Sequence, residues 1–283
     1  MTINTVGIIG AGTMGNGIAQ VVAVAGLKAV MIDVNEAALA KGLATLTGSL
    51  DRLVAKGKLD AAVKEAALSR IETSTDYQRL TAVDLVIEAA TENTDLKIRI
   101  LRQIESVARP DTIIASNTSS ISITALGAAL TDASRFIGMH FFNPVPLLPL
   151  VEIIRGIQTS AATIEAVREL TVKLDKSPIS VKNAPGFVVN RILVPMINEA
   201  FFVLAEGIAT AEEIDLGMRL GANHPIGPLA LADLIGLDVC LSVLDVFLKD
   251  FGDSKYRASP LLRELVAAGR LGRKVGQGVY RYD

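Results

Sequence analysis

The segment GMHFFNPVPLLPLVEII, residues 138–154, places a histidine and a glutamate in an otherwise almost wholly apolar stretch. His140 is one of only two histidines in the chain, and Glu152 lies between pairs of aliphatic residues. Burying either side chain alone would cost free energy, because an unpaired polar group loses its hydration. We therefore expect the two side chains to meet. An imidazole held by a carboxylate exchanges a proton near neutral pH, which is general acid–base chemistry.

The flanking residues predict two strands that would bring this pair together. RFIGM precedes His140 and IIRG follows Glu152, whereas Pro144, Pro146 and Pro149 lie between them. Proline has no N–H group for a strand ladder, so the middle is expected to be a connection. His140 would end one strand and Glu152 would lie near the start of the next, within hydrogen-bond reach.

A second motif, GAGTMG, follows the apolar run TVGII and precedes a helical pattern and then KAVMID. Gly10 is expected to make a tight turn, Gly12 to let the backbone approach a pyrophosphate, and Gly15 to let the helix pack on the strand. The N–H groups at the helix start would hold the phosphates. Asp33 closes the second strand and would accept hydrogen bonds from a ribose. No arginine follows it directly, which favours NAD over NADP.

The rest of the first half predicts an α/β fold. Strand patterns at residues 82–89 and 112–116 flank a helical stretch at 95–107. This alternation indicates a mostly parallel sheet. An insertion over residues 35–70, interrupted at KGKLD, is expected to form a helical hairpin. The sequence thus predicts a Rossmann-type dinucleotide-binding domain over residues 1–183.

The second half, residues 184–283, is expected to be an all-helical domain and a dimerisation surface, because it is rich in leucine, valine and isoleucine. Asn190 lies on the first turns of its leading helix, where it either faces solvent or faces a cleft between the domains. Three aspartates in a predicted helix over 228–249 suggest a solvent-facing side. The helices expected after the first are 211–220, 228–249 and 260–268.

Other polar residues have two interpretations each. Glu92 in ATEN and Ser119 in SNTSS follow predicted strands, where they either cap helices or contact a ligand. Arg52, Lys56 and Lys58 at the tip of the hairpin form either a solvated face or a contact for an anionic substrate tail.

Composition limits the class of protein. The chain has 283 residues, a net charge of −2 and 50% hydrophobic residues, which indicates a globular protein and gives no reason to expect nucleic acid. No apolar run is long enough for a membrane helix. A first strand starting by Thr5 is expected to leave no room for a targeting segment. The single cysteine excludes an internal disulfide and, with the other features, favours the cytoplasm.

The sequence resembles the short-chain L-3-hydroxyacyl-CoA dehydrogenases, especially the bacterial 3-hydroxybutyryl-CoA dehydrogenases. The motifs that carry the resemblance are GIIGAGTMGNGIAQ, ASNTSSI, GMHFFNPVPLLPLVEII, PGFVVNRIL and GRKVGQGVYRY, and they span nearly the whole chain. The resemblance implies NAD as cofactor, an acyl-CoA substrate, a homodimer formed through the helical domain, and no metal.

The resemblance also implies residue roles. His140 would be the base and Glu152 its orienting partner, while Ser119 and Asn190 would bind the substrate oxygen. Ser49 and Lys56 match positions that meet the CoA moiety. The implied cofactor contacts are Gly10, Gly12, Thr13, Met14, Gly15, Asp33, Glu92, Lys97, Asn143 and Lys274.

Two alternatives remain open at this point. The same chemistry could act on a free hydroxy acid or sugar acid, for which a basic hairpin tip has no use. A non-catalytic, crystallin-like relative could keep the fold, although such a protein would not need the polar set of Ser119, His140, Glu152 and Asn190.

Overall fold

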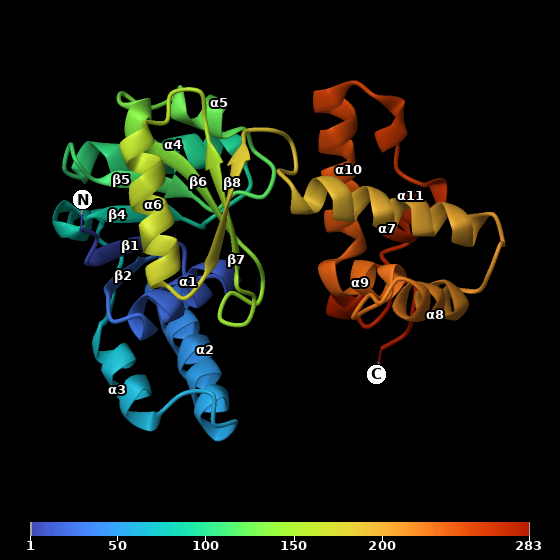
Figure 1. The fold of residues 1–283 in the computed structure, drawn as a ribbon, viewed down its shortest axis with the longest axis horizontal. Coiled ribbons are helices and arrows are strands. Elements are labelled where there is room, and N and C mark those ends of the chain that lie inside the picture. Colours follow the sequence, from blue (N-terminus) through green and yellow to red (C-terminus); the bar gives the residue numbers. More distant parts are fainter. Residues whose placement is uncertain (1, 283) are drawn as a thin grey trace. The chain divides into compact units, whose positions relative to one another are not determined.

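The computed structural model describes residues 2–282, and the chain divides between Ala184 and Pro185 into two compact units (Figure 1). The first unit is an eight-stranded sheet with helices on both faces, and the second is helical. The predicted fold class is confirmed. Among the described residues, no helix is both long and apolar enough to span a membrane.

The sheet has the strand order β3-β2-β1-β4-β5-β6-β7-β8. The pairings are parallel except between β6 and β7, so β7 and β8 run against the other strands. The strands are β1 (Thr5–Ile9), β2 (Lys28–Ile32), β3 (Ile71–Ser74), β4 (Leu85–Glu88), β5 (Ile113–Ser116), β6 (Phe136–Phe141), β7 (Leu150–Arg155) and β8 (Ser177–Lys182). The central strands β4, β5 and β6 are buried along their whole length, as expected for a sheet covered on both faces.

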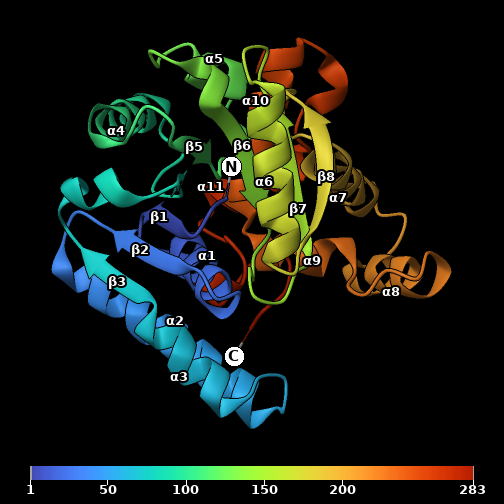
Figure 2. The same ribbon diagram turned by 60° about the vertical axis from the view of Figure 1, so that its left-hand side comes forward.

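Helices cover both faces of this sheet (Figures 1 and 2). The face that carries Val151 and Ile153 shares one apolar core with three helices, α1 (Thr13–Val24), α2 (Glu36–Ala55) and α6 (Ala161–Lys173). The opposite face carries Gly138, which leaves no room for a Cβ against Ile123. That face lies under α5 (Ile123–Gly127) and α4 (Thr94–Val107). Because strand residues alternate between faces, His140 lies on the same face as Gly138.

The predicted hairpin is formed by α2 and α3 (Ala61–Ser69), and it extends away from the sheet (Figure 1). Asn35 caps α2 by accepting a hydrogen bond from the N–H of Ala38. Strands β3 and β8 and helix α6 were not predicted from the sequence. Both strands lie at the edges of the sheet and are only partly buried, so their apolar pattern is weak.

The second unit packs its helices around a separate apolar core. One predicted helix, residues 228–249, is in fact two, because Gly236 has a φ of +106° and ends the first of them. Asp233, expected to face solvent, is only 1% exposed. The helices are α7 (Val189–Ala205), α8 (Ala211–Gly221), α9 (Pro228–Ile235), α10 (Leu237–Phe251) and α11 (Pro260–Ala267).

Candidate active site

The glycine-rich turn between β1 and α1 has the geometry of a phosphate cradle. Gly10 has a φ of +102°, and a Cβ there would lie 2.8 Å from the carbonyl oxygen of Ala89. A Cβ on Gly15 would overlap the carbonyl oxygen of Gly10, whereas one on Gly12 would meet nothing within 4 Å. Gly12 is also the N-cap of α1 and provides no capping side chain. The first N–H groups of α1 therefore receive no hydrogen bond from a capping side chain, which suits them to hold a pyrophosphate.

Thr13 and Met14 form the first turn of α1, and Asp33 directly follows β2. Oδ2 of Asp33 accepts a hydrogen bond of 2.7 Å from the N–H of Ala11, which fixes the carboxylate at the glycine turn. The side chain remains partly exposed, so its oxygens can also accept from ribose hydroxyls. Val34 is 86% exposed and brings no positive charge for a 2′-phosphate. The residues present fit NAD.

His140 and Glu152 are direct partners in the antiparallel pairing of β6 with β7. Nδ1 of His140 lies 2.8 Å from Oε2 of Glu152, so the two side chains meet as the strand pattern predicts. Glu152 is fully buried and His140 is 6% exposed. A hydrogen on Nδ1, shared with the carboxylate, corresponds to the tautomer with its lone pair on Nε2. That nitrogen can accept a proton.

The connection between these strands folds back onto the nucleotide-binding helix. Val145 packs so closely on Gly17 of α1 that a Cβ added to Gly17 would lie 2.9 Å from the Cβ of Val145. Lys176, only 8% exposed, donates hydrogen bonds of 2.7 and 2.9 Å to the carbonyl oxygens of Val145 and Leu148. Burial lowers the pKa of this lysine. Asn143 lies exposed at the start of the same connection. Lys176 thus fixes the loop. This role was not predicted from the sequence, because a single lysine has no local pattern that indicates it.

A polar network lies at the ends of β4 and β5. Glu88 is fully buried and accepts hydrogen bonds from Ser116 and Lys97. Lys97 is 1% exposed and also lies 3.8 Å from Glu92. The amino group of Lys97 thus lies between two carboxylates. Its predicted contact with the cofactor stays a prediction.

Glu92 binds the turn that contains Ser119. Its Oε1 accepts hydrogen bonds from the N–H of Ser119 at 2.7 Å and from the hydroxyl of the same residue at 2.9 Å. Its Oε2 accepts from the hydroxyl of Thr118 at 2.7 Å. These contacts place Ser119 on the edge of the sheet at which the parallel strands β1, β4, β5 and β6 end.

Ser49 and Lys56 lie on the hairpin. Ser49 is partly buried on α2, and Lys56 is the exposed C-cap of that helix. Seven residues separate them, which is two helical turns, so they share one side of the helix. A nearby hollow of about 450 Å³ is lined by Lys58 and by residues of the proline-rich connection, not by Ser49 or Lys56.

Two predicted site residues lie on the second unit. Asn190 is the second residue of α7 and is partly buried. Lys274 donates to both carboxylate oxygens of Asp238, at the first turn of α10.

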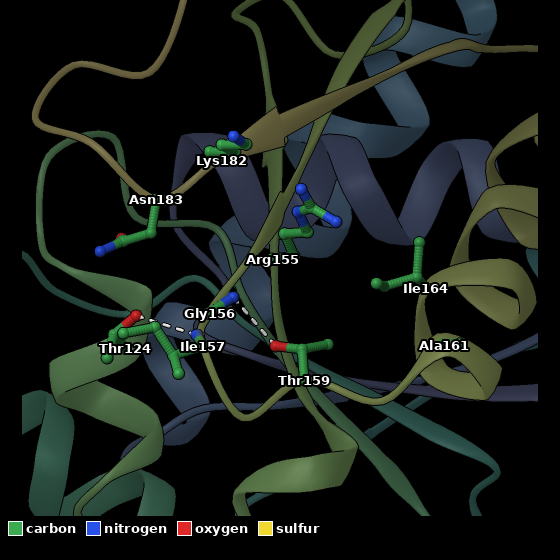
Figure 3. A pocket seen from close by; sticks show the side chains of 9 residues that line it. All are labelled: Thr124, Arg155, Gly156, Ile157, Thr159, Ala161, Ile164, Lys182 and Asn183. Carbon is green, nitrogen blue, oxygen red and sulfur yellow. Dashed lines mark hydrogen bonds between the residues drawn. The ribbon is translucent and has the colours of Figure 1, made fainter.

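A hollow of about 530 Å³ lies at the carboxyl ends of β7 and β8 (Figure 3). Arg155 and Lys182 are register partners there and Thr124 closes one side. Arg155 and Glu152 are an odd number of residues apart, so they point to opposite faces of the sheet. This hollow therefore does not contain the histidine–glutamate pair.

Comparison with known families matches both units. Residues 5–184 match the family model described as 3-hydroxyacyl-CoA dehydrogenase, NAD binding domain. Residues 186–282 match the model described as 3-hydroxyacyl-CoA dehydrogenase, C-terminal domain. The chain belongs to the 3-hydroxyacyl-CoA dehydrogenase family. The resemblance seen in the sequence and the NAD-binding fold are thereby confirmed.

Similar members of the 3-hydroxyacyl-CoA dehydrogenase family match over almost their full length. A probable 3-hydroxybutyryl-CoA dehydrogenase of Deinococcus radiodurans is 52% identical, covering 98% of this chain and 99% of the relative. A 3-hydroxybutyryl-CoA dehydrogenase of Bradyrhizobium diazoefficiens is 51% identical, covering 99% and 96%. The crystal structure of (S)-3-hydroxybutyryl-CoA dehydrogenase from Ralstonia eutropha is 63% identical, with a TM-score of 0.97 and all of both chains covered.

Proposed function

We propose that the protein interconverts (S)-3-hydroxyacyl-CoA and 3-ketoacyl-CoA with NAD, and that it acts on short chains such as 3-hydroxybutyryl-CoA. The His140–Glu152 pair carries this proposal, because it provides a buried proton acceptor. The pair lies at the end of β6, on the same edge of the sheet as the glycine turn that follows β1. Ligands of open parallel sheets bind beyond this edge. The substrate of the similar 3-hydroxybutyryl-CoA dehydrogenases supports the substrate class.

Proton transfer is the part of the reaction that this chain's side chains perform. NAD, when bound, supplies the nicotinamide that accepts or returns the hydride. In oxidation, Nε2 of His140 takes the proton of the 3-hydroxyl group, and in reduction the imidazolium returns it. Glu152 holds the ring and stabilises its charged form. Ser119 would bind the 3-oxygen, where negative charge develops. The role of Asn190, on the second unit, stays a prediction.

The CoA part of the substrate is assigned to the hairpin. Lys56 is exposed and shares one side of α2 with Ser49, and an ammonium group suits a phosphate of CoA. We expect Lys56→Ala to raise KM for the CoA ester by about fivefold with little change in kcat, because uniform binding is lost. Lys41→Ala, an exposed lysine of the same helix, is the matched control. An unchanged KM in Lys56→Ala would contradict this assignment.

A homodimer formed through the second unit is also part of the proposal. Leu216 and Leu220 lie one turn apart on α8 and are 49% and 74% exposed. Exposed leucines on one face of a helix favour burial against a second copy. Leu220→Glu should therefore shift the mass measured by light scattering from dimer to monomer. Monomeric wild-type protein would contradict the proposal. The cytoplasmic location stays a prediction.

A direct assay tests the activity. Each substrate, acetoacetyl-CoA or free acetoacetate, is assayed with NADH and separately with NADPH. Consumption of the reduced cofactor is followed. We expect kcat/KM for the CoA ester with NADH to exceed that for the free acid by about a hundredfold or more, because remote binding energy is lost with CoA. Equal rates with the free acid would favour a hydroxy-acid dehydrogenase, and no turnover would favour a non-catalytic relative.

A further inference from the structure

The hydroxyl group of Ser119 is already engaged by a side chain of its own unit. It carries one hydrogen, and that hydrogen lies on the 2.9 Å contact with Oε1 of Glu92, since a carboxylate can only accept. The N–H of Ser119 donates to the same oxygen at 2.7 Å. One carboxylate oxygen therefore fixes both the main chain and the side chain of Ser119.

Glu92 is itself held from the other side. Its Oε2 accepts from the hydroxyl of Thr118, which is 1% exposed, and lies 3.8 Å from Nζ of Lys97. Lys97 is fixed in turn by the fully buried Glu88, which also accepts from Ser116. Buried networks in which the members are paired are rigid, so Glu92 has a defined position although its side chain is 48% exposed.

Counting hydrogens shows what this arrangement requires during the reaction. A 3-hydroxyl group has one hydrogen, which the proposed mechanism assigns to His140. Ser119 can then stabilise the oxygen only by donating its own hydrogen, which in the structure goes to Glu92. The hydroxyl of Ser119 must therefore rotate from Glu92 to the substrate oxygen. Its N–H bond to Glu92 can persist throughout, because that contact does not depend on the hydroxyl.

We propose that Glu92 is a positioning residue for Ser119, which it holds by the main-chain N–H while it accepts the hydroxyl hydrogen until the substrate oxygen replaces it. The proposal rests on the proposed function, since it requires Ser119 to bind the 3-oxygen. It gives Glu92 a role beyond contact with the cofactor, and it gives the buried Lys97 and Glu88 a reason to be there.

A double-mutant cycle tests this role. Wild type, Glu92→Ala, Ser119→Ala and the double variant are compared by kcat/KM for acetoacetyl-CoA at saturating NADH, so that a change in cofactor affinity does not enter. We expect Glu92→Ala to lower kcat/KM by about tenfold in the wild-type background, as for loss of charge-assisted hydrogen bonds. In the Ser119→Ala background the same change should cost less than about threefold, because its target is gone.

Controls separate the possible failures. Dissociation constants for NADH, from cofactor fluorescence, report any loss of cofactor contact independently of turnover. Glu165→Ala, a glutamate that is 57% exposed and paired with Arg168 on α6, should leave kcat/KM unchanged. A loss that is equal in both backgrounds would overturn the positioning role while leaving the proposed function intact. Wild type that does not reduce acetoacetyl-CoA would instead overturn the proposed function.

Discussion

Glu152 in the first unit and Asp233 in the second are both buried carboxylates, 0% and 1% exposed, yet their surroundings differ. Glu152 meets the imidazole of His140, whose other ring nitrogen can accept a proton. Asp233 accepts hydrogen bonds from the N–H groups of Val279 and Tyr280 and from the hydroxyl of Tyr282.

Asp233 has a structural role, because its hydrogen bonds hold the segment 279–282 against α9. Burial and the carboxylate of Asp233 raise the pKa of Tyr282, so this partner keeps its proton at neutral pH. Gly272 and Gly278 pack so closely on Asp233 that neither leaves room for a Cβ. The difference between the two acids teaches that burial alone does not identify a catalytic carboxylate. The chemistry of the partner does.

The largest effect on turnover is expected when the imidazole partner of Glu152 is removed. His140→Ala should lower kcat by about a hundredfold or more, because general acid–base catalysis contributes at least that much. NADH binding, measured by fluorescence, should persist, since the glycine turn and Asp33 are unchanged. A loss of kcat smaller than fivefold, itself only about 1 kcal/mol, would remove His140 as the base.

A smaller loss is expected when only the charge of Glu152 is removed. Glu152→Gln keeps an acceptor oxygen for Nδ1 of His140 but cannot stabilise the imidazolium ion. We expect kcat to fall by about tenfold, with unfolding by urea followed in parallel. An unchanged kcat would mean that Glu152 is no different in role from Asp233.

A third carboxylate, Asp33, differs from both because it is only partly buried and accepts a hydrogen bond from the N–H of Ala11. Removing it and adding a positive charge next to it, in Asp33→Ala/Val34→Arg, should favour a 2′-phosphate over a ribose hydroxyl. The ratio of kcat/KM for NADH to that for NADPH should fall by about tenfold or more. An unchanged ratio would show that Asp33 does not contact the ribose.

The smallest effect on turnover is expected at Asp233. Asp233→Asn keeps the shape but turns an amide donor toward main-chain N–H groups, so the free energy of unfolding should fall by about 2–4 kcal/mol. At 25 °C kcat should stay within about threefold, because no proton transfer involves this residue. Asp245→Asn is the control, since its side chain is 49% exposed and forms a surface ion pair with Arg263. A hundredfold loss of kcat in Asp233→Asn without loss of stability would reverse the distinction.

Local patterns were enough to predict the glycine turn and the two strands that pair His140 with Glu152. Both depend on residues close together in the chain, 12 positions apart for the acid and the base. The surroundings of Asp233 could not be predicted in this way, because its partners lie 46 to 49 residues further on. The residues around an aspartate in an apolar helix do not show whether it holds a distant segment or faces solvent.

The enclosure of Lys97 was missed for a related reason. Glu88 and Lys97 lie nine residues apart, but Ser116, which completes their network, is brought in by the pairing of β4 with β5. Lys176 likewise holds a loop about 30 residues earlier in the chain. Such contacts depend on the order of the strands, which periodicity does not report.

The central claim is that the imidazole of His140, steadied by Glu152, faces the reacting oxygen. A crystal structure with NAD and acetoacetyl-CoA bound tests this most directly. We expect Nε2 of His140 within about 3.2 Å of the 3-oxygen, with Nδ1 still bonded to Glu152. An imidazole turned away from that oxygen, or a ketone carbon bound remote from the nicotinamide, would contradict it.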